Sequence, residues 1–418
     1  MWADLADIGR DGRRGGFSRH GFDDADLTMR EWFTEQAGRR GLEVRADRNG
    51  NLWAWWGSPA AGAIVTGSHL DSVPGGGAFD GPLGVVSALL AVDALRDAGF
   101  RPARPLAVVV FAEEEGGRFG VPCLGSRLLT GALAPSAALG LSDPDGVPLA
   151  SALERAGIDP ARVGRDAASV AGIGTFVELH VEQGRGLVDR DASVGVAESI
   201  LAHGRWRLTF SGEGNHAGTT ALGDRRDPVL PAAAAVLAAR RVASTVDGAR
   251  ATVGRIVPNP GGTNVIASTV DVWLDARALS AVDARVVVDE IVAAARAAVA
   301  EEGCALTVGE ESFGDTVVFD AALRDRVSAV VGGVSAAPGG GRRGLPGGGP
   351  RGLPGGGPAL PTGAGHDAGI LAAAGVPAAM LFVRNPTGVS HAPAEHAERS
   401  DCLAGVEALT AVLRDLAS

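Results

Sequence analysis

The chain contains no tyrosine, only three cysteines and only eight histidines among its 418 residues. Without tyrosine, no phenolic side chain can donate a proton in any site of this protein. The cysteines are odd in number, widely spaced and outside any paired motif: Cys123, Cys304 and Cys402. This spacing argues against a disulfide framework and against a thiolate metal site. We expect each cysteine to be a small buried apolar residue.

Long apolar runs and basic blocks are also missing. No stretch reaches the roughly 18 uninterrupted apolar residues of a membrane-spanning helix, and residues 1–7 lack the charged and apolar regions of a signal peptide. These absences predict a cytoplasmic protein. The net charge is −11 and the sequence pI is near 5.3. We therefore expect neither nucleic acid nor an anionic membrane as a partner.

Strand and helix patterns alternate along the first half of the chain. A helical pattern at 23–39 is followed by an aromatic strand at 51–56, an apolar strand at 63–66, a helix that opens at 81–85 and runs to about residue 98, and a strand at 106–111. The fourth of these, the helix, is apolar nearly all round, which is typical of a helix buried against a sheet. The expected fold class is α/β, with a mostly parallel sheet and helices on both faces. The length predicts two or three domains of about 100–200 residues each.

Acidic residues and histidines collect where two of these strands end. His69 and Asp71 follow the strand at 63–66, with Asp80 shortly after, and Glu113, Glu114 and Glu115 follow the strand at 106–111. Open α/β sheets place their chemistry at the carboxyl ends of strands. The two clusters together look like half of a two-metal hydrolytic site.

Two further histidines follow strand-like runs. His180 directly follows the run at 175–179, and His391 comes after the run at 379–383. A single histidine at a strand end is more often structural than a ligand. Imidazole and carboxylate are, however, the ligands that zinc, manganese and cobalt accept. Five such residues after strands therefore predict a metal site: His69, Asp80, Glu115, His180 and His391.

The pattern changes after residue 197. A strand at 205–210, a helix at 227–243, strands at 251–256 and 269–274, a helix at 281–300 and a strand at 305–308 follow one another. This β-α-β-β-α-β order describes a small ferredoxin-like α+β insert. Because the candidate ligands resume only at His391, the first domain must be discontinuous. We predict one domain from residues 1–197 and 315–418, with an inserted domain at 198–314.

One segment is of low complexity. The eight residues at 343–350 are repeated without change at 351–358, and both copies are rich in glycine and proline. We predict a flexible surface loop at 335–358, lengthened by a tandem duplication. A phosphate-binding loop is disfavoured because no Lys-Ser or Lys-Thr pair follows the glycines.

Taken together, the motifs resemble the dinuclear metal amidohydrolases that include allantoate amidohydrolase and N-carbamoyl-L-amino acid hydrolase. These enzymes belong to the wider superfamily of aminoacylases and di-zinc aminopeptidases. The resemblance runs from near residue 1 to near residue 410, in the expected order. The segments that carry it are 67–73, 79–81, 114–119, 178–184 (Glu-Leu-His-Val-Glu-Gln-Gly), 215–220 (Asn-His-Ala-Gly-Thr-Thr), 264–266, 363–368 and 390–391.

The resemblance implies two divalent ions per subunit, zinc or manganese, with cobalt or nickel as alternatives. Asp80 would bridge them, with His69 and His180 completing one site and Glu115 and His391 the other. The resemblance also makes Glu114 the general base, while Glu113 is the alternative base for which a structural role is favoured. We expect Asp71 to accept a hydrogen bond from the His69 ring and orient it.

The same resemblance makes the insert a lid and dimerisation domain. It implies that His216 reaches from the lid of a partner subunit to the tetrahedral oxyanion, which makes the enzyme a homodimer. Gln183, Asn264 and Arg277 would hold the ureido and carboxylate groups of the substrate, and a guanidinium fork suits a carboxylate. His366 and Asp367 would lie next to the substrate, although a structural role for them is equally compatible with the sequence.

Three functional hypotheses follow. The leading one is metal-dependent hydrolysis of a non-peptide C–N bond in a ureido acid, either allantoate or an N-carbamoyl-L-amino acid, with a slight preference for allantoate. The second is a dipeptidase or aminoacylase of the same superfamily. The third is a non-catalytic metal-binding scaffold, which the intact set of ligands and Glu114 disfavours.

Overall fold

The structure is a computed structural model that describes residues 1–335 and 356–418. Most of the loop expected at 335–358 therefore lies outside the described residues. The end of that segment is packed: the Gly357 N–H donates to the Ser328 carbonyl (3.0 Å), and the Pro358 carbonyl accepts from the Val196 N–H (2.8 Å).

Two compact units make up the chain. Unit 1 comprises Met1–Ser199 and Val318–Ser418, and unit 2 comprises Ile200–Val317. The boundaries expected from the sequence, after residues 197 and 314, lie two and three residues earlier than these.

Unit 1 is built on a sheet of nine strands within the described residues, in the order β1-β2-β4-β3-β5-β15-β6-β13, with β14 paired to β6. The strands are β1 (Glu43–Ala46), β2 (Leu52–Trp56), β3 (Ala63–His69), β4 (Leu106–Phe111), β5 (Ile173–Val181), β6 (Val194–Ile200), β13 (Val317–Val318), β14 (Ala359–Thr362) and β15 (Ala378–Val383). The central strands β4, β3, β5 and β15 are parallel, and β1, β2 and β6 add antiparallel pairs. This mostly parallel centre confirms the α/β fold class.

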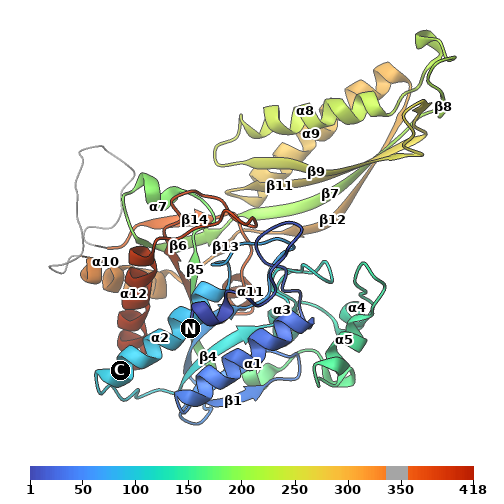
Figure 1. The fold of residues 1–418 in the computed structure, drawn as a ribbon. Helices are drawn as coiled ribbons and strands as arrows, with labels where there is room; N and C mark the ends of the chain where they lie inside the picture. Colours follow the sequence, from blue (N-terminus) through green and yellow to red (C-terminus); the bar gives the residue numbers. More distant parts are fainter. Residues whose placement is uncertain (336–355) are drawn as a thin grey trace. The chain divides into compact units, whose positions relative to one another are not determined.

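Helices cover both faces of this sheet (Figure 1). They are α1 (Asp24–Arg39), α2 (Pro82–Asp97), α3 (Leu124–Thr130), α4 (Pro135–Leu139), α5 (Leu149–Arg155), α6 (Ala167–Gly172), α7 (Gly186–Asp189), α10 (Ala321–Ser335), α11 (Asp367–Ala373) and α12 (Arg399–Ala417), with short 3-10 turns at Ala3–Leu5 and Pro160–Arg162. The main core lies between the sheet and α1, α2, α10 and α12, where Val108, Leu179 and Leu381 are fully buried. Because strand residues alternate between faces, the neighbouring Phe111, Phe176 and Phe382 belong to the opposite face, towards α11.

Unit 2 is a four-stranded antiparallel sheet in the order β12-β7-β11-β9 with two helices. Its elements are β7 (Ala202–Ser211), β8 (Asn215–His216), a 3-10 turn at Leu222–Asp224, α8 (Val229–Ala243), β9 (Arg250–Asn259), β10 (Val265–Ile266), β11 (Thr269–Ala278), α9 (Ala281–Glu302) and β12 (Ala305–Gly314). The buried residues of the sheet form a core with one face of α8 and α9. The order β7-α8-β9-β11-α9-β12 is the ferredoxin-like order expected, while the short pair β8 and β10 was not anticipated.

The expectation for the cysteines was wrong at two positions. Cys123 is buried, but Cys304 and Cys402 are only partly buried. Cys304 follows the end of α9 after one intervening residue, and Cys402 lies in the first turn of α12. Both are therefore near helix ends, where fewer neighbours cover a side chain. No helix in the described ranges is both long and apolar enough to cross a membrane.

Candidate metal centre

The carboxyl ends of three neighbouring parallel strands meet at one edge of the unit 1 sheet. His69 is the last residue of β3 and is paired with Phe111, the last residue of β4. His180 lies within β5, which pairs with β3 on its other side. Glu113, Glu114 and Glu115 follow β4 after one intervening residue. Parallel pairing therefore brings the side chains of separate segments to one place, as expected for this fold.

The first group of side chains contains His69, Asp80 and His180. Asp80 Oδ1 lies 3.4 Å from His69 Nε2 and 3.1 Å from His180 Nε2. All three side chains are buried, and their potential ligand atoms lie within 4.8 Å of one another. The structure thus assembles three of the five predicted ligands.

The hydrogen bonds of the two imidazoles determine which nitrogen faces Asp80. His69 Nδ1 lies 3.1 Å from the Asp71 carbonyl, and His180 Nδ1 lies 2.9 Å from the Val181 carbonyl. A carbonyl only accepts, so in each neutral ring Nδ1 carries the hydrogen and Nε2 presents a lone pair. Both Nε2 atoms are buried without a hydrogen-bond partner. Lone pairs that face a carboxylate oxygen repel it unless a proton or a metal ion lies between them, so the arrangement of these atoms is compatible with a bound metal ion.

The pKa values of both histidines agree with a strongly anionic environment. Burial alone would lower the pKa of His69, but Glu114, Asp71 and Asp80 together raise it well above its ordinary value. Burial alone would also lower the pKa of His180. The nearby Asp80 carboxylate outweighs burial, so the pKa of His180 is raised. A site that holds a proton this firmly attracts any cation.

The second group contains Asp80, Glu115 and His391. His391 Nε2 lies 3.2 Å from Glu115 Oε2 and 3.5 Å from Asp80 Oδ2, and Glu115 Oε1 is buried without a partner. His391 is half-exposed, and its hydrogen bond to Glu115 raises its pKa to about 9. Its φ of 55° is in the left-handed region, which a non-glycine residue adopts at a cost that often marks a functional site. Asp80 is therefore the residue that the two groups share.

Gln183 lies against this shared carboxylate. Its Nε2 donates to Asp80 Oδ2 at 2.8 Å and to Ser390 Oγ at 3.2 Å, and it lies 3.4 Å from His391 Nε2. The buried Gln183 Oε1 has no partner. The amide group predicted to hold a substrate is thus placed at the candidate metal centre.

The three consecutive glutamates have different surroundings. Glu114 is buried, its Oε2 lies 3.6 Å from His69 Nε2, and its Oε1 accepts from the Cys123 thiol at 3.3 Å. Burial raises the pKa of Glu114 well above its ordinary value. Glu113 instead accepts three backbone N–H bonds of 2.9 Å, from Gly21, Arg118 and Phe119. Glu113 is therefore a loop anchor, a side chain that holds loop backbone in place through hydrogen bonds. Its carboxylate is buried and not solvated.

The interaction expected of Asp71 differs in the structure. The His69 ring bonds to the backbone carbonyl of Asp71, and the Asp71 carboxylate lies 3.6 Å from the ring. That carboxylate accepts from the N–H groups of Glu114 (3.1 Å) and Glu115 (3.0 Å). Asp71 therefore orients His69 through its main chain and the glutamate loop through its side chain. Residue spacing alone could not distinguish these two roles.

A third buried group adjoins the first and was not predicted from the sequence. It contains Glu178, His180 and His366, with ligand atoms within 4.8 Å of one another. The rings of His180 and His366 are 4.6 Å apart, and Glu178 Oε1 accepts from Ser68 Oγ at 2.8 Å. Asp367 is buried beside it and is bonded to Ser126. The signal that was available is spacing, because Glu178 is two residues from His180 on a strand and therefore shares its face.

Three predicted site residues belong to unit 2. His216 is on β8 and Asn264 directly precedes β10, and the Ala217 N–H donates to the Asn264 carbonyl at 3.0 Å. Arg277 is near the end of β11, where its Nε and Nη2 donate to Asp275 at 2.8 and 3.0 Å. The fold therefore brings His216 and Asn264 together and leaves Arg277 at the other end of β11.

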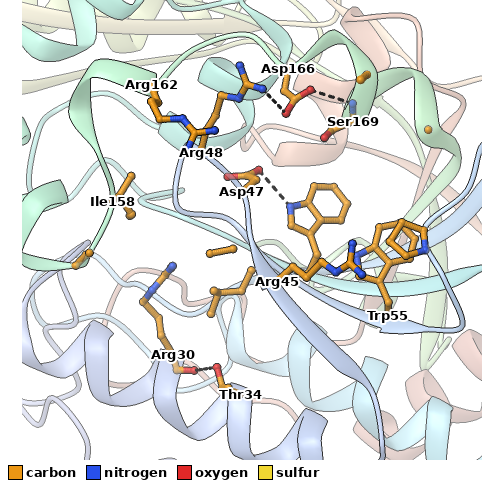
Figure 2. A pocket seen from close by; sticks show the side chains of 18 of the residues that line it. Arg30, Thr34, Arg45, Asp47, Arg48, Trp55, Ile158, Arg162, Asp166 and Ser169 are labelled. Carbon is orange, nitrogen blue, oxygen red and sulfur yellow. Dashed lines mark hydrogen bonds and ion pairs between the residues drawn. The ribbon is translucent and has the colours of Figure 1, made fainter.

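A separate hollow of about 1380 Å³ lies around β1, α1 and α6 and contains none of the five candidate ligands (Figure 2). Its charged lining residues are Arg30, Arg45, Arg48, Arg155 and Arg162, and Glu31, Glu35, Asp47, Asp159 and Asp166. Five positive and five negative groups balance, and Arg48 already pairs with Asp166 at 3.2 Å. This balance favours no charged ligand.

Comparison with known proteins gives consistent results along the chain. The sequence profile of "Peptidase family M20/M25/M40" matches residues 65–319 and 356–415. N-carbamoyl-L-amino acid amidohydrolase of Geobacillus stearothermophilus is 34% identical over 417 residues, covering 98% of this chain and 96% of the relative. Allantoate amidohydrolase of Bacillus subtilis is 32% identical over 403 residues, covering 94% and 92%.

Solved structures agree with this result. An amidase of the hydantoinase/carbamoylase family from Burkholderia vietnamiensis is 28% identical, with a TM-score of 0.83 over 100% of this chain and 95% of that one. The resemblance noted from the sequence motifs is thereby confirmed. The chain belongs to peptidase family M20/M25/M40.

Proposed function

We propose that this protein is a metal-dependent amidohydrolase that cleaves a C–N bond other than a peptide bond in a small ureido acid. The substrate is allantoate or an N-carbamoyl-L-amino acid. The observation that carries the proposal is a cluster of potential metal-ligand atoms around Asp80. Three of them, His69 Nε2, His180 Nε2 and Glu115 Oε1, are buried without a hydrogen-bond partner. The relatives named for these two substrates support it, because each aligns over more than nine-tenths of this chain.

The donor set suits two divalent ions. His69 and His180 with one oxygen of Asp80 would hold the first, and Glu115 and His391 with the other oxygen would hold the second. Imidazole and carboxylate ligands accept zinc, manganese, cobalt or nickel, so the set does not by itself select one metal. When bound, such ions supply Lewis acidity and lower the pKa of water to about 7.

Glu114 is the proposed general base. It lies beside the first group without being one of its ligands, and burial favours its protonated form after it has taken a proton. The carboxylate removes a proton from the attacking water as the oxygen bonds to the ureido carbon. The same proton is then delivered to the leaving nitrogen as the C–N bond breaks. The products are the amine and carbamic acid, which decomposes to ammonia and carbon dioxide.

His216 has the hydrogen-bonding state that this reaction needs. Its Nδ1 accepts from the N–H groups of Gly218 (3.0 Å) and Thr219 (3.2 Å). Because Nδ1 is an acceptor, the hydrogen of the neutral ring lies on Nε2. An exposed Nε2–H can donate to an oxygen that becomes negative in the transition state. The protein has no tyrosine that could take this role.

In this proposal, Arg277 contributes to one active site of the dimer. His216 and Asn264 of the same chain contribute to the other. β11 runs from Thr269, next to β10, to Arg277, a span of about 26 Å at roughly 3.3 Å per residue. That span exceeds the length of a small ureido acid, so one substrate cannot contact both ends of β11 in a single chain. A homodimer, in which His216 and Asn264 act on the site of the partner, removes this conflict. Gln183 remains the proposed ureido contact from unit 1.

The direct test is ammonia release by the full chain, stripped of metal and then reloaded with manganese or zinc. Allantoate, a panel of N-carbamoyl-L-amino acids and a panel of dipeptides are supplied at equal concentration. We expect metal-dependent ammonia release from one ureido substrate. Faster turnover of allantoate than of every carbamoyl amino acid would identify the substrate as allantoate, and the reverse order would identify a carbamoyl amino acid.

The alternatives have distinct outcomes in the same assay. Faster release of amino acids from dipeptides than of ammonia from ureido acids would favour the dipeptidase or aminoacylase hypothesis. Binding of two ions without turnover of any substrate would favour the non-catalytic scaffold.

A further inference from the structure

Glu395 is a buried acidic residue to which the proposed reaction gives no role. It lies between β15 and α12, four residues beyond the half-exposed His391, and only 5% of its surface is exposed. A carboxylate is rarely buried this deeply unless other groups satisfy it. Its partners therefore indicate its role.

Both partners of Glu395 Oε1 belong to the segment that carries Asp80. The Phe79 N–H donates to Oε1 at 2.8 Å, and the Asp80 N–H donates to the same atom at 2.9 Å. These hydrogen bonds connect positions 315 and 316 residues apart in the chain. One side-chain oxygen thus secures the main chain of the proposed bridging ligand.

The side chain of Asp80 contacts the same segment of the chain through Ser390. Ser390 Oγ lies 3.1 Å from Asp80 Oδ2 and 3.4 Å from Glu395 Oε2. A hydroxyl donates one hydrogen, and the shorter contact is to Asp80. The main chain and the side chain of Asp80 are therefore both held by the segment that also supplies His391.

The two amides that bond to Glu395 lie outside regular secondary structure. Residues 77–80 belong to no helix or strand, and α2 begins only at Pro82. The amides of Phe79 and Asp80 precede the helix and need partners from outside it. Gly77 leaves room for the carboxylate, because a Cβ on Gly77 would lie 2.3 Å from Glu395 Oε1. Sequence and packing are thus both adapted to this contact.

We propose that Glu395 is a positioning residue that holds Asp80 in the orientation needed to bridge two metal ions. The inference rests on the proposed function for the ions themselves. Without Glu395, the buried Asp80 amide and the partly buried Phe79 amide would lose their acceptor, and the segment would move to satisfy them. Asp80 would then no longer direct one oxygen at His69 and His180 and the other towards His391.

The test compares E395A with E395Q in the full chain, stripped of metal and titrated with manganese in a calorimeter. E395A removes the acceptor, so we expect manganese affinity to fall about 10- to 100-fold, as when other outer partners of metal ligands are removed. E395Q retains an acceptor oxygen, so we expect its affinity to stay within about threefold of the unmodified protein. Hydrogen exchange at the Phe79 and Asp80 amides of the metal-free protein should accelerate in E395A and not in E395Q.

E398A is the matched control in the same segment, because Glu398 is exposed and pairs only with His396 among the described contacts. It should match the unmodified protein in both measurements. G77A offers a second variant if E395A does not fold, since its methyl group would displace the Glu395 carboxylate and should reproduce the loss of affinity. Unchanged manganese affinity in E395A, or equal losses in E395A and E395Q, would overturn the proposal.

The titration needs no substrate, so it separates this proposal from the proposed function. Two bound manganese ions with no hydrolysis of any ureido acid would refute the function and leave the role of Glu395 open to measurement. Ammonia release with unchanged manganese affinity in E395A would refute the positioning role alone.

Discussion

At the scale of single residues, neighbouring acids in the candidate centre differ because their hydrogen-bond partners differ. Glu113 accepts three backbone N–H bonds, whereas Glu114 has one thiol donor and lies near His69. Burial and chemical type are nearly the same for both. The partners therefore make Glu113 a loop anchor and leave Glu114 as the proposed general base.

We predict that E114Q lowers kcat by about 10³-fold, since it removes the general base. The metal content should not change, because Glu114 is not a proposed ligand. Ammonia release and metal analysis of the same preparation check both statements. Residual activity within a few-fold of the unmodified enzyme would contradict the assignment of Glu114 as base.

E113Q should mainly lower the stability of the protein, whereas E114Q should mainly lower its turnover. Replacing one oxygen by an NH₂ group sets a donor against backbone N–H donors, so we expect unfolding free energy to fall by about 1–3 kcal/mol. Turnover per folded, metal-loaded molecule should remain near that of the unmodified enzyme. Thermal or denaturant unfolding beside E114Q measures the contrast, and a large loss of kcat without a loss of stability would make Glu113 the base.

The pKa of His391 leads to a prediction about pH. Because Glu115 raises this pKa to about 9, the ring is protonated below pH 9 in the metal-free protein and must lose its proton to bind an ion. Apparent affinity at the second site should therefore increase about tenfold per pH unit from pH 6.5 to 8.5. Calorimetry in two buffers with different ionisation enthalpies measures the released proton. H391A should remove this release, and a pH-independent affinity would show that His391 is not a ligand.

At the scale of elements, the strands of unit 2 separate buried from outward-facing side chains by simple alternation. Along β11, Val272, Leu274 and Ala276 are buried, whereas Trp273, Asp275 and Arg277 alternate with them on the other face.

The outer face of α8 is different, because it leaves apolar side chains exposed. Leu237 is 73% exposed and Leu230 is 53% exposed. Seven residues apart, they lie on one face of the helix.

This face of α8 is the surface we expect to be covered in the proposed dimer. L237D would bury a charge there, so we predict that the variant sediments as a monomer and loses ammonia release while it still binds metal. L403D, on the exposed surface of α12 in unit 1, is the control and should retain the mass of the unmodified protein. An unchanged mass of L237D would exclude this face as the interface.

At the scale of the whole molecule, the candidate centre depends on a discontinuous domain. Asp80 comes before the insert, and His391, Ser390 and Glu395 come after it. Both segments meet around one carboxylate. A chain of net charge −11 thus concentrates several acids in one buried place, which bound cations would stabilise.

Mixed subunits test whether His216 acts across the dimer. E114Q and H216A should each be nearly inactive alone. If a partner supplies His216, a mixed dimer of the two variants contains one complete site, and random mixing restores about a quarter of the full activity. Co-expression with two different tags and purification through both isolates the mixed dimer. Absence of activity in that dimer would place His216 and Glu114 of one chain in the same site.

The local features of this protein could be predicted from its amino-acid sequence. Side-chain alternation and apolar periodicity predicted the parallel strands, the buried helix and the order of the insert, because these patterns arise from neighbours a few residues apart. Strand-end positions also singled out the residues that the fold brings together around Asp80. The family resemblance followed from the same short motifs.

Which atoms come into contact depends on the folded chain and could not be predicted from these motifs. The Asp71 carboxylate binds the glutamate loop, Glu178 and His366 adjoin His180, and Glu395 holds the amide of Asp80. The separation of Arg277 from His216 also appears only when β11 is seen at full length. These facts depend on contacts between residues far apart in the chain, and local periodicity carries no information about which distant groups will satisfy a buried donor or charge.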